Sequence, residues 1–553
     1  LAEALAKGHT LGEAVRSLAR AHRVVVVGDL DVAVSARLRA VLLVTSLHRG
    51  GAERVVIDLL AALPRAGVEA RLAVLDRPRR EAFPPPPGAL LLYERARGRG
   101  ERLDLVARAA IGWGADVVHA HLLDGADVEA LGRAGPPVVV TAHNARAGWP
   151  PGYATLGPAA ALVLGCSLAT ARALRASEAQ PPIRTAWNGI QPPPAAPEGA
   201  RAEVRRELGV SADALVLVTV ANARPQKRLE RAPAVVAELV RRGVDAHWIL
   251  VGGLAGNDDV AQAAVRDLEA AIASAGVSAR AHRVGPRADV PRWLAAADVF
   301  LSTSDFEGLS LAHLEARAAG LPLVATRVGG SEELGSVYDA CTLLDPDAAP
   351  EGFADAVLGV GSASPSLPHA FGVPAMAARH GALYARASRP RPAGDGRGVV
   401  LVTNNFSTGG AQTSARRLLG ALALRGVPCR AVVLEERAER RTPGLAALEA
   451  SGVPVDLARR AGAHDPKLTA DDVVRVVDEH DPRAVVFWNV IPEHKVLIAD
   501  ALLGRRVFDV SPGEMYFRSL DRYFAKPRVG LPSLAGEDYG ALLAGVVVKY
   551  GAE

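Results

Sequence analysis

Hydrophobic and polar positions alternate along this chain in a βα pattern. Short runs rich in β-branched residues are separated by longer stretches rich in Ala, Leu and Arg. This pattern is typical of parallel sheets covered by helices. The expected strands are 40–45, 71–75, 116–120, 137–142 and 161–167 and, after a Pro-rich stretch at 188–199, 214–221, 247–253, 298–303 and 322–326. We therefore predict an α/β fold with two consecutive doubly wound, Rossmann-like domains that face each other across a cleft.

The same pattern sets the predicted domain boundaries. We expect a first domain at 39–187 and a second at 188–388 that ends in a helix over 371–388. A Pro- and Gly-rich linker at 389–398 leads to a third unit at 399–553. Residues 1–38, which include the strand-like run 23–29, receive no assignment.

The third unit repeats the start of the first domain. Residues 41–75 align with 399–434, and the pair Gly50–Gly51 matches Gly409–Gly410. Chance similarity of two βα units is the alternative, but strand, glycine loop, helix and turn agree in order, which favours a duplication. The third unit then resembles the first domain without its partner. Because the chain begins with Leu1 and stops soon after the run 545–550, we expect a piece of a longer protein.

Composition narrows the function only slightly. The 553 residues carry 64 basic and 60 acidic side chains, a balance that gives no argument for nucleic-acid binding. Three distant cysteines without a CxxC spacing make a disulfide framework or zinc site unexpected and favour a reducing, cytoplasmic compartment. No apolar run reaches the roughly 18 residues of a membrane span.

Glycine and cationic residues follow the first strand of each domain. Gly50 and Gly51 open a helix, where free N–H groups can bind an anion, although a tight turn without a ligand fits equally well. Arg224 and Lys227 leave the carboxyl end of strand 214–221, where open α/β sheets bind ligands. Two cations at this spacing suit a diphosphate, whereas the alternative is a solvated basic helix start.

Three histidines lie at the ends of two strands. His119 and His121 alternate along one strand, and His143 ends the next. A metal pair would need further ligands and a βα barrel that the sequence does not show. Because His119 and His121 share a face, one of them can be a packing residue, and we interpret His121 as the residue in the cleft.

The most informative stretch is 305–320. Glu307 precedes a helix that we expect to begin near Leu309, and Glu315 lies two turns further along. Backbone N–H groups around Gly308, Leu309 and Ser310 would then face the cleft. A separation of about 10–12 Å between the two carboxylates matches the distance from sugar to ribose in a nucleotide sugar.

These residues together resemble the retaining glycosyltransferases of the GT-B class, specifically glycosyltransferase family 4, over residues 40–388. The E-x7-E pattern of Glu307 and Glu315 carries the resemblance, with the Gly329–Gly330 motif that ends at Glu333 and the NGI at 188–190. The segment 285–302 resembles the family stretch beside the nucleobase.

The resemblance implies transfer of a sugar from a nucleotide-diphosphate sugar to an acceptor hydroxyl, with retention at the anomeric carbon and no obligatory metal or other cofactor. It implies catalytic roles for His121 and Glu307. It also implies that the donor is bound by Gly50, Gly51, Arg224, Lys227, Gly308, Leu309, Ser310 and Glu315.

The third unit departs from this pattern. In the alignment Phe487 and Asn489 replace the two strand histidines, and Pro512 stands for His143. We expect no catalysis there, and an E-x7-E pair does not follow in this sequence.

Several alternatives stay open. They are a nucleotide-sugar epimerase of the same fold, a phosphorylase, for which no pyridoxal-binding lysine is identified, and a tandem binding protein without turnover. The acceptor can be a glycan, a lipid-linked sugar or a small molecule. The basic segment 94–102 could contact anionic lipid at the cytoplasmic membrane face, although a solvated loop is the simpler interpretation.

Overall fold

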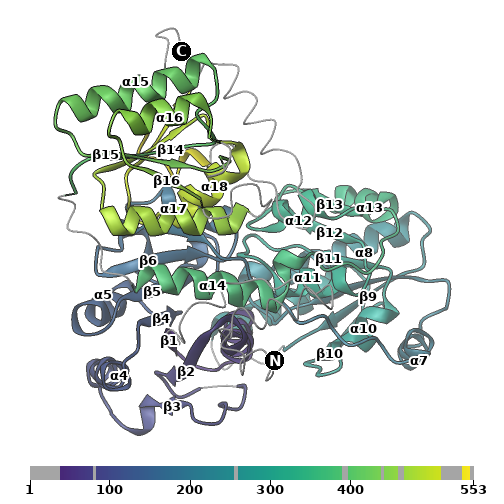
Figure 1. The fold of residues 1–553 in the computed structure, drawn as a ribbon. Coiled ribbons are helices and arrows are strands. Elements are labelled where there is room, and N and C mark those ends of the chain that lie inside the picture. The colour runs from purple at the N-terminus through teal and green to yellow at the C-terminus, as the bar shows by residue number, and fades with distance from the viewer. Residues whose placement is uncertain are drawn as a thin grey trace, which may run out of the picture.

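Three parallel β-sheets with covering helices make up the computed structural model (Figure 1). It describes residues 38–78, 82–253, 259–388, 396–436, 441–458, 466–511 and 539–548. The run 23–29 and most of the predicted linker lie outside the described residues. The sheets confirm the predicted α/β class with two Rossmann-like domains followed by a third.

The first sheet has seven strands in the order β3-β2-β1-β4-β5-β6-β7. Its strands are β1 (Leu38–Val44), β2 (Val68–Val74), β3 (Leu90–Leu91), β4 (Val117–His121), β5 (Val138–Ala142), β6 (Ala160–Gly165) and β7 (Ile183–Thr185). The helices α3 (Gly51–Ala62), α4 (Arg99–Trp113), α5 (Gly125–Ala134) and α6 (Leu168–Arg175) connect them. Strands β4 and β5 are buried at every position, as expected for a parallel sheet covered on both faces.

The second sheet has six strands in the order β10-β9-β8-β11-β12-β13. Its strands are β8 (Leu215–Val220), β9 (Ala246–Val251), β10 (Ala281–Gly285), β11 (Val299–Ser302), β12 (Leu323–Thr326) and β13 (Cys341–Leu344). Its helices are α7 (Ala200–Glu207), α8 (Ala232–Arg241), α9 (Asp259–Ser274), α10 (Val290–Ala296), α11 (Leu311–Ala318), α12 (Ser331–Val337) and α13 (Pro350–Gly359).

The chain order reverses direction at one point in each sheet. In the first sheet the neighbours β1 and β4 flank this switch point, and in the second sheet β8 and β11 do. Open α/β sheets bind their ligands at the carboxyl ends of such strands. The two switch points therefore mark where a site between the domains is expected.

Helix α14 (Val373–Ala387) returns from the second domain to the first (Figure 1). Val373, Met376 and Tyr384 are buried in one core cluster with strand β1 and helix α3. The sequence placed this helix with the second domain. The structure shows that it completes the apolar core of the first, because its buried stripe faces β1 and α3.

The third sheet repeats the strand order of the first, β16-β15-β14-β17-β18-β19. Its strands are β14 (Val399–Thr403), β15 (Cys429–Val433), β16 (Val455–Leu457), β17 (Ala484–Trp488), β18 (Val507–Ser511) and β19 (Gly545–Val548). Its helices are α15 (Gly410–Leu424), α16 (Pro443–Ala450), α17 (Pro466–His480) and α18 (Pro492–Ala501). The shared order fits the predicted duplication, which stays a prediction.

The third unit docks on the first domain through the end of α18. Asp500 forms a bidentate ion pair with Arg379 of α14, in which the two guanidinium nitrogens lie 2.5 and 2.9 Å from the two carboxylate oxygens. Arg184 of β7 donates to the Asp500 carbonyl oxygen at 2.8 Å, and Arg386 donates to the Ala501 carbonyl oxygen at 3.0 Å. Burial opposes ionisation of Asp500, but the charges of Arg379 and Arg184 outweigh it and hold the pKa of this carboxyl below its usual value.

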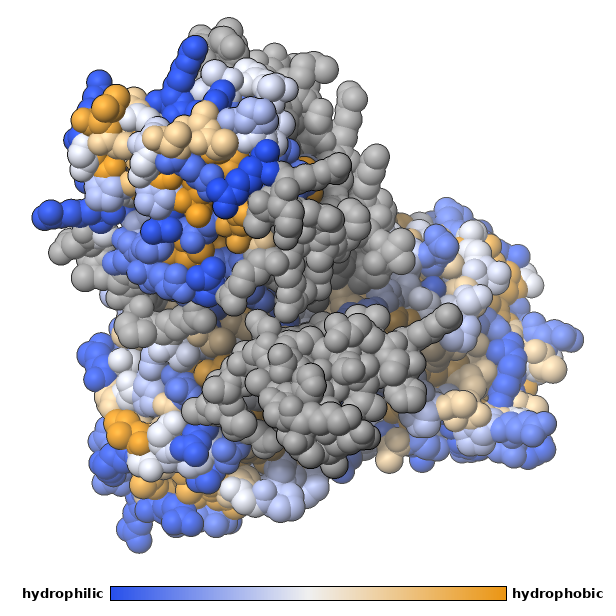
Figure 2. Space-filling view, in the orientation of Figure 1, coloured by the Kyte–Doolittle hydropathy of each residue, from blue (hydrophilic) through white to orange (hydrophobic). Residues whose placement is uncertain are grey.

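Hydrophilic and hydrophobic side chains are mixed over the described surface in the view of Figure 2. Large exposed apolar residues are scattered over all three units, and Leu424 of α15 is the most exposed of them at 91%. Among the helices of the described ranges, none combines the length and apolar character needed to cross a bilayer.

Candidate active site

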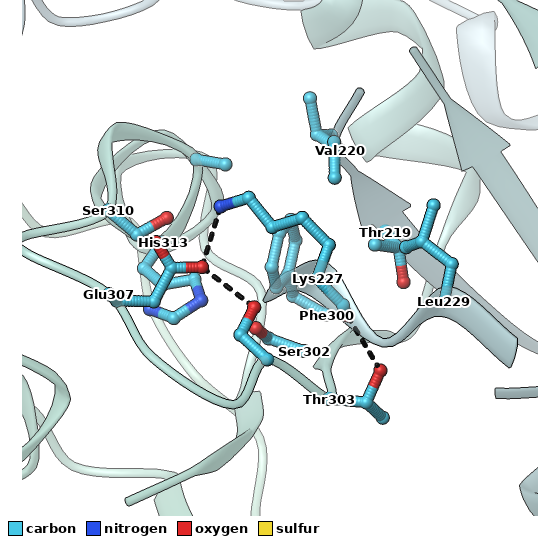
Figure 3. A pocket seen from close by; sticks show the side chains of 13 residues that line it. Thr219, Val220, Lys227, Leu229, Phe300, Ser302, Thr303, Glu307, Ser310 and His313 are labelled. Atoms are coloured by element: carbon cyan, nitrogen blue, oxygen red, sulfur yellow. Dashed lines mark hydrogen bonds and ion pairs between the residues drawn. The ribbon is translucent and has the colours of Figure 1, made fainter. Parts of the chain in front are cut away.

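The centre of the candidate site is an ion pair at the switch point of the second sheet. Lys227 leaves the loop after β8, and Glu307 leaves the loop after the neighbouring strand β11. Lys227 Nζ lies 2.6 Å from Glu307 Oε1, and Ser304 Oγ donates to the same oxygen at 2.7 Å. Figure 3 shows the two side chains pointing toward each other in the lining of a small cavity.

The side chain of Glu307 is only 8% exposed. Burial raises the pKa of a carboxyl, but the charge of Lys227 and the hydrogen bonds outweigh it, so the pKa of Glu307 stays below its ordinary value. Glu307 is therefore a buried carboxylate that is ionised at neutral pH.

His313 lines the same cavity and was not singled out by the sequence reasoning. It is 2% exposed, and its ring meets Phe300 edge-on at 5.6 Å. Burial lowers the pKa of His313 to about 4, so the ring is neutral. Its spacing of six residues from Glu307 was available, but only the structure shows that both line one cavity.

The helix after Glu307 begins later than predicted. Helix α11 starts at Leu311, with Ser310 as its N-cap, and not near Leu309. Leu309 is instead buried in the second-domain core, and its carbonyl oxygen accepts a hydrogen bond from Asn188 Nδ2 at 3.1 Å. The Gly308 carbonyl oxygen also accepts a bond from Gly330 N at 2.6 Å. These contacts hold residues 308–309 out of the helix.

The N-termini of two helices from different domains face each other. A Cβ on Gly51, at the start of α3, would lie 4.0 Å from the side chain of Leu311, at the start of α11. The first N–H groups of a helix lack partners within it and carry partial positive charge. Gly50 and Gly51 are thus placed opposite the stretch that contains Gly308, Leu309 and Ser310.

Glu315 faces the first domain from the middle of α11. Burial raises the pKa of Glu315, while Arg54 of α3 lowers it and Asp58 raises it further. The same two residues form an ion pair with each other at 2.8 Å. Glu315 therefore lies at the domain boundary, in line with its predicted place in the cleft.

Arg224 also lies near the boundary, where its charge acts on Glu53, a carboxyl of the first domain that was not predicted from the sequence. Glu53 in the first turn of α3 is 7% exposed, and burial raises its pKa to about 7 despite the opposing charge of Arg224. The sequence held one signal for Glu53: it is a carboxylate in the first turn of a helix that we predicted to bind an anion. Arg228, by contrast, is paired with Asp305 at 2.8 Å and with Glu230.

The strand histidines take two different environments. Both ring nitrogens of His119 are hydrogen-bonded, Nδ1 to Tyr384 Oη at 2.6 Å and Nε2 to Thr141 Oγ1 at 2.7 Å. His119 is therefore a packing residue. His121 and His143 are joined by a bond of 2.9 Å between Nδ1 and Nε2. The interpretation of His121 as the residue in the cleft needs correction: its ring has no exposed surface, because His119 and His143 flank it.

Glu333 connects the two domains. Its carboxylate accepts bonds from Trp187 Nε1 at 2.6 Å and from Ala169 N, at the start of α6, at 3.0 Å. Burial raises the pKa of Glu333 to about 7. The glycine motif that ends at Glu333 thus fixes the second domain to the start of α6.

Two family models match consecutive parts of the chain. "Glycosyltransferase Family 4" matches residues 49–192, and "Glycosyl transferases group 1" matches residues 214–361. The first match covers the first sheet with Gly50, Gly51 and the histidines, and the second covers Lys227, Glu307 and Glu315.

Curated relatives match shorter segments. D-inositol 3-phosphate glycosyltransferase of Thermobispora bispora is 34% identical over 134 residues, 24% of this chain and 31% of that protein. N-acetyl-alpha-D-glucosaminyl L-malate synthase of Bacillus anthracis is 30% identical over 132 residues, 24% of this chain and 32% of that protein. The chain thus spans about a third of the length of these relatives.

Among solved structures, HepE of Anabaena in complex with UDP matches at a TM-score of 0.45 and 20% identity, over 64% of this chain and 97% of that chain. Sucrose-phosphate synthase of Thermosynechococcus elongatus matches at 0.48 and 18%, over 63% and 98%. The family assignment rests on the two family models, which cover both sides of the cleft. The chain therefore belongs to the group 1, family 4 glycosyltransferases.

Proposed function

We propose that this chain is a retaining glycosyltransferase that moves a sugar from a nucleotide-diphosphate sugar to an acceptor hydroxyl. The buried pair of Lys227 and Glu307, 2.6 Å apart at the switch point of the second sheet, carries the proposal. Burying a carboxylate and the lysine that keeps it ionised costs desolvation free energy. Such buried pairs are concentrated at binding and catalytic sites.

In this proposal the donor lies between the two domains. Its diphosphate binds between the starts of α3 and α11, where Arg224 and Lys227 supply positive charge. These groups and the helix N-termini neutralise the diphosphate, so no metal is required. Glu307 contacts the hydroxyls of the donor sugar, and Glu315 contacts the ribose.

The chemical step needs no covalent bond to the protein. The bond between the anomeric carbon and the diphosphate oxygen breaks, and the acceptor oxygen bonds to the same face of that carbon. The acceptor proton passes to the departing diphosphate, whose negative charge Arg224 and Lys227 stabilise.

The proposed acceptor is a glycan, a lipid-linked sugar or a small hydroxylated molecule, and not a nucleic acid. Membrane contact through 94–102 has less support, because two of its arginines are used inside the domain. Arg99 pairs with Asp127 at 2.5 Å and Asp76 at 2.9 Å, and Arg102 pairs with Asp76 at 2.5 Å.

The test begins with donor binding. UDP-, GDP- and ADP-sugars are screened for a rise in the apparent melting temperature, since a ligand of the folded state stabilises it. The donor that binds is then incubated with candidate acceptors, and NMR of the product reads the anomeric configuration. We expect a product with the configuration of the donor; an inverted product contradicts retention, and an epimerised donor without transfer supports the epimerase alternative.

A further inference from the structure

The chain crosses between the first two domains at two points. Ala186 is buried in a first-domain core cluster, whereas Trp187, the next residue, packs against the second-domain core. On the way back, Phe371 is buried in the second-domain core and Val373 in the first-domain cluster. Any rotation of one domain against the other must therefore bend the chain at these two crossings.

The two crossings are hydrogen-bonded to each other. Ile190 N donates to the Phe371 carbonyl oxygen at 2.9 Å, and Val373 N donates to the Ile190 carbonyl oxygen at 3.1 Å. A Cβ on Gly189 would lie 2.7 Å from the main chain of Gly372, so the two segments are in close contact. The crossings therefore form a single hinge, and a group that fixes the chain beside it can restrain both of them.

Arg379 of α14 connects the two segments that enter this hinge from the first domain. Its Nε donates to the carbonyl oxygen of Thr185 at 3.0 Å, at the end of β7 and one residue before Ala186. Its other two guanidinium nitrogens bond to the Asp500 carboxylate of the third unit. A bidentate pair fixes the plane of a guanidinium group, so Asp500 orients Arg379 for its bond to β7.

The end of α18 makes further contacts at the same place. In Figure 1 the third unit lies beside α14. Arg184 of β7 donates to the Asp500 and Ala499 carbonyl oxygens at 2.8 and 3.3 Å, and Arg386 donates to the Ala501 carbonyl oxygen at 3.0 Å. The last carbonyl groups of a helix lack partners within it and carry partial negative charge, which favours cations there. The last turn of α18 is therefore held against the first domain next to the hinge.

We infer that the third unit is a brace for the hinge between the first two domains, in which Asp500 holds Arg379 on the Thr185 carbonyl oxygen and thereby favours the closed contact between these domains. Bending the hinge would shift β7 against α14 and break this set of bonds. Bonds that exist in one arrangement only shift the equilibrium toward that arrangement. Because the candidate site lies between the domains, the brace couples the third unit to it.

The test measures the distance between the first two domains in the full chain. Spin labels are attached to cysteines introduced by Ala109→Cys in α4 and Ala270→Cys in α9, at two exposed helix positions. Cys341 and Cys429 are first replaced by serine, whereas Cys166 is buried and is kept. Pulsed electron paramagnetic resonance then gives the distribution of distances, and a broader distribution reports a looser hinge.

Two variants remove the brace, and a matched variant spares it. Asp500→Ala releases Arg379, and Arg379→Met removes the guanidinium group but keeps an apolar side chain. Arg386→Met loosens the docking of α18 but leaves the pair of Arg379 and Asp500 in place. We expect a broader distance distribution in the first two variants and the wild-type distribution in Arg386→Met. Asp500→Asn, which keeps the shape of the side chain, should give a smaller broadening with the fold intact.

Three results would overturn the inference. An unchanged distribution in both Asp500→Ala and Arg379→Met would show that the third unit does not restrain the hinge. Broadening in only one of them would contradict a brace in which Asp500 acts through Arg379. Equal broadening in Arg386→Met would show that docking as a whole, and not the bond to Thr185, restrains the domains.

A second readout follows a bond that spans the two domains. The N–H of Ala169 at the start of α6 donates to the Glu333 carboxylate of the second domain at 3.0 Å. Hydrogen–deuterium exchange in the peptide that contains Ala169 should be faster in Asp500→Ala and Arg379→Met and unchanged in Arg386→Met. Exchange at the wild-type rate in all three variants would contradict the brace.

Both readouts are independent of the proposed function. A chain that shows the expected broadening but transfers no sugar would contradict sugar transfer and would support the brace. A chain that transfers sugar, with the same distance distribution in the wild type and in Asp500→Ala, would contradict the brace alone.

Discussion

Gly308 lies directly against the carbonyl oxygen of His143, which brings the Glu307 loop of the second domain onto the first domain. A Cβ at this glycine would lie 2.2 Å from that oxygen and 2.6 Å from Cys166 Sγ, both in the first domain. Real Cβ atoms do not approach a carbonyl oxygen so closely, so the contact depends on glycine.

The first prediction is that Gly308→Ala separates the two halves of the site. We expect the affinity for the nucleotide sugar to fall at least tenfold, because Glu307 and the start of α11 move away from α3. Calorimetry with the donor measures this. Gly352→Ala in α13 is the matched control, since a Cβ there meets nothing within 4 Å. Unchanged affinity in Gly308→Ala would contradict the closed contact between the domains.

The second prediction concerns Glu53, whose pKa is raised to about 7. Below pH 7 the side chain is mostly neutral and can donate to a phosphate oxygen, and above pH 7 it is ionised and repels the diphosphate. The diphosphate of a nucleotide sugar keeps its charge over this range. We therefore expect donor affinity to fall up to about tenfold between pH 6 and pH 8.

The variant Glu53→Gln removes this titration and should flatten the profile. Gln412 follows the glycine pair of the third unit as Glu53 follows that of the first, so the replacement is compatible with such a loop. Binding titrations at both pH values measure the slope. An equal slope in Glu53→Gln and the wild type would assign the dependence to another group.

The third prediction concerns acid stability. Burial lowers the pKa of His143 to about 3 and of His380 to about 4, whereas an unfolded histidine titrates near 6.5. The unfolded chain therefore binds more protons below pH 6.5, and stability falls as the pH falls from about 6.5 to 4. Each such histidine contributes at most about 1.4 kcal/mol per pH unit.

Thermal melting between pH 7 and pH 4 checks this slope. The melting temperature of His380→Leu should fall less on acidification than that of the wild type. The melting temperature of the exposed control His480→Leu should fall as much as that of the wild type. Parallel curves for His380→Leu and the wild type would contradict a buried neutral His380.

The fourth prediction concerns the third unit. Asp500→Ala leaves the buried Arg184 and the partly exposed Arg379 without their carboxylate, and we expect it to cost less than the about 3–5 kcal/mol of breaking a fully buried pair. We expect faster hydrogen–deuterium exchange in peptides of α18 and of α14. Asp345→Ala, at a side chain that is 77% exposed, is the control. Exchange as slow as in the wild type would show that the third unit docks through other contacts.

Local patterns allowed much of this fold and part of the site to be predicted. Buried strands such as β8 and β11 coincide with apolar runs in the sequence, and residues that follow their carboxyl ends, such as Lys227 and Glu307, could be located from their place after these runs. The short edge strands β3 and β7, with two and three residues, leave no such pattern and were not predicted.

The remaining site residues depend on contacts across long sequence separations. Glu333 meets Trp187, 146 positions away, and His119 meets Tyr384, 265 positions away. Nothing in either local sequence indicates these partners. The return of α14 to the first domain is a tertiary packing choice of the same kind, because its apolar stripe could cover either sheet.

Sugar transfer by Glu307→Gln tests the central claim most directly. The replacement keeps the shape but removes the negative charge that pairs with Lys227 at 2.6 Å. Transfer from the bound nucleotide sugar is measured in the wild type, in Glu307→Gln and in the exposed control Glu269→Gln, whose side chain is 57% exposed. We predict a loss of kcat of about 100-fold or more in Glu307→Gln alone, with all three chains folded. Equal transfer rates in all three would contradict a role for Glu307 in the reaction.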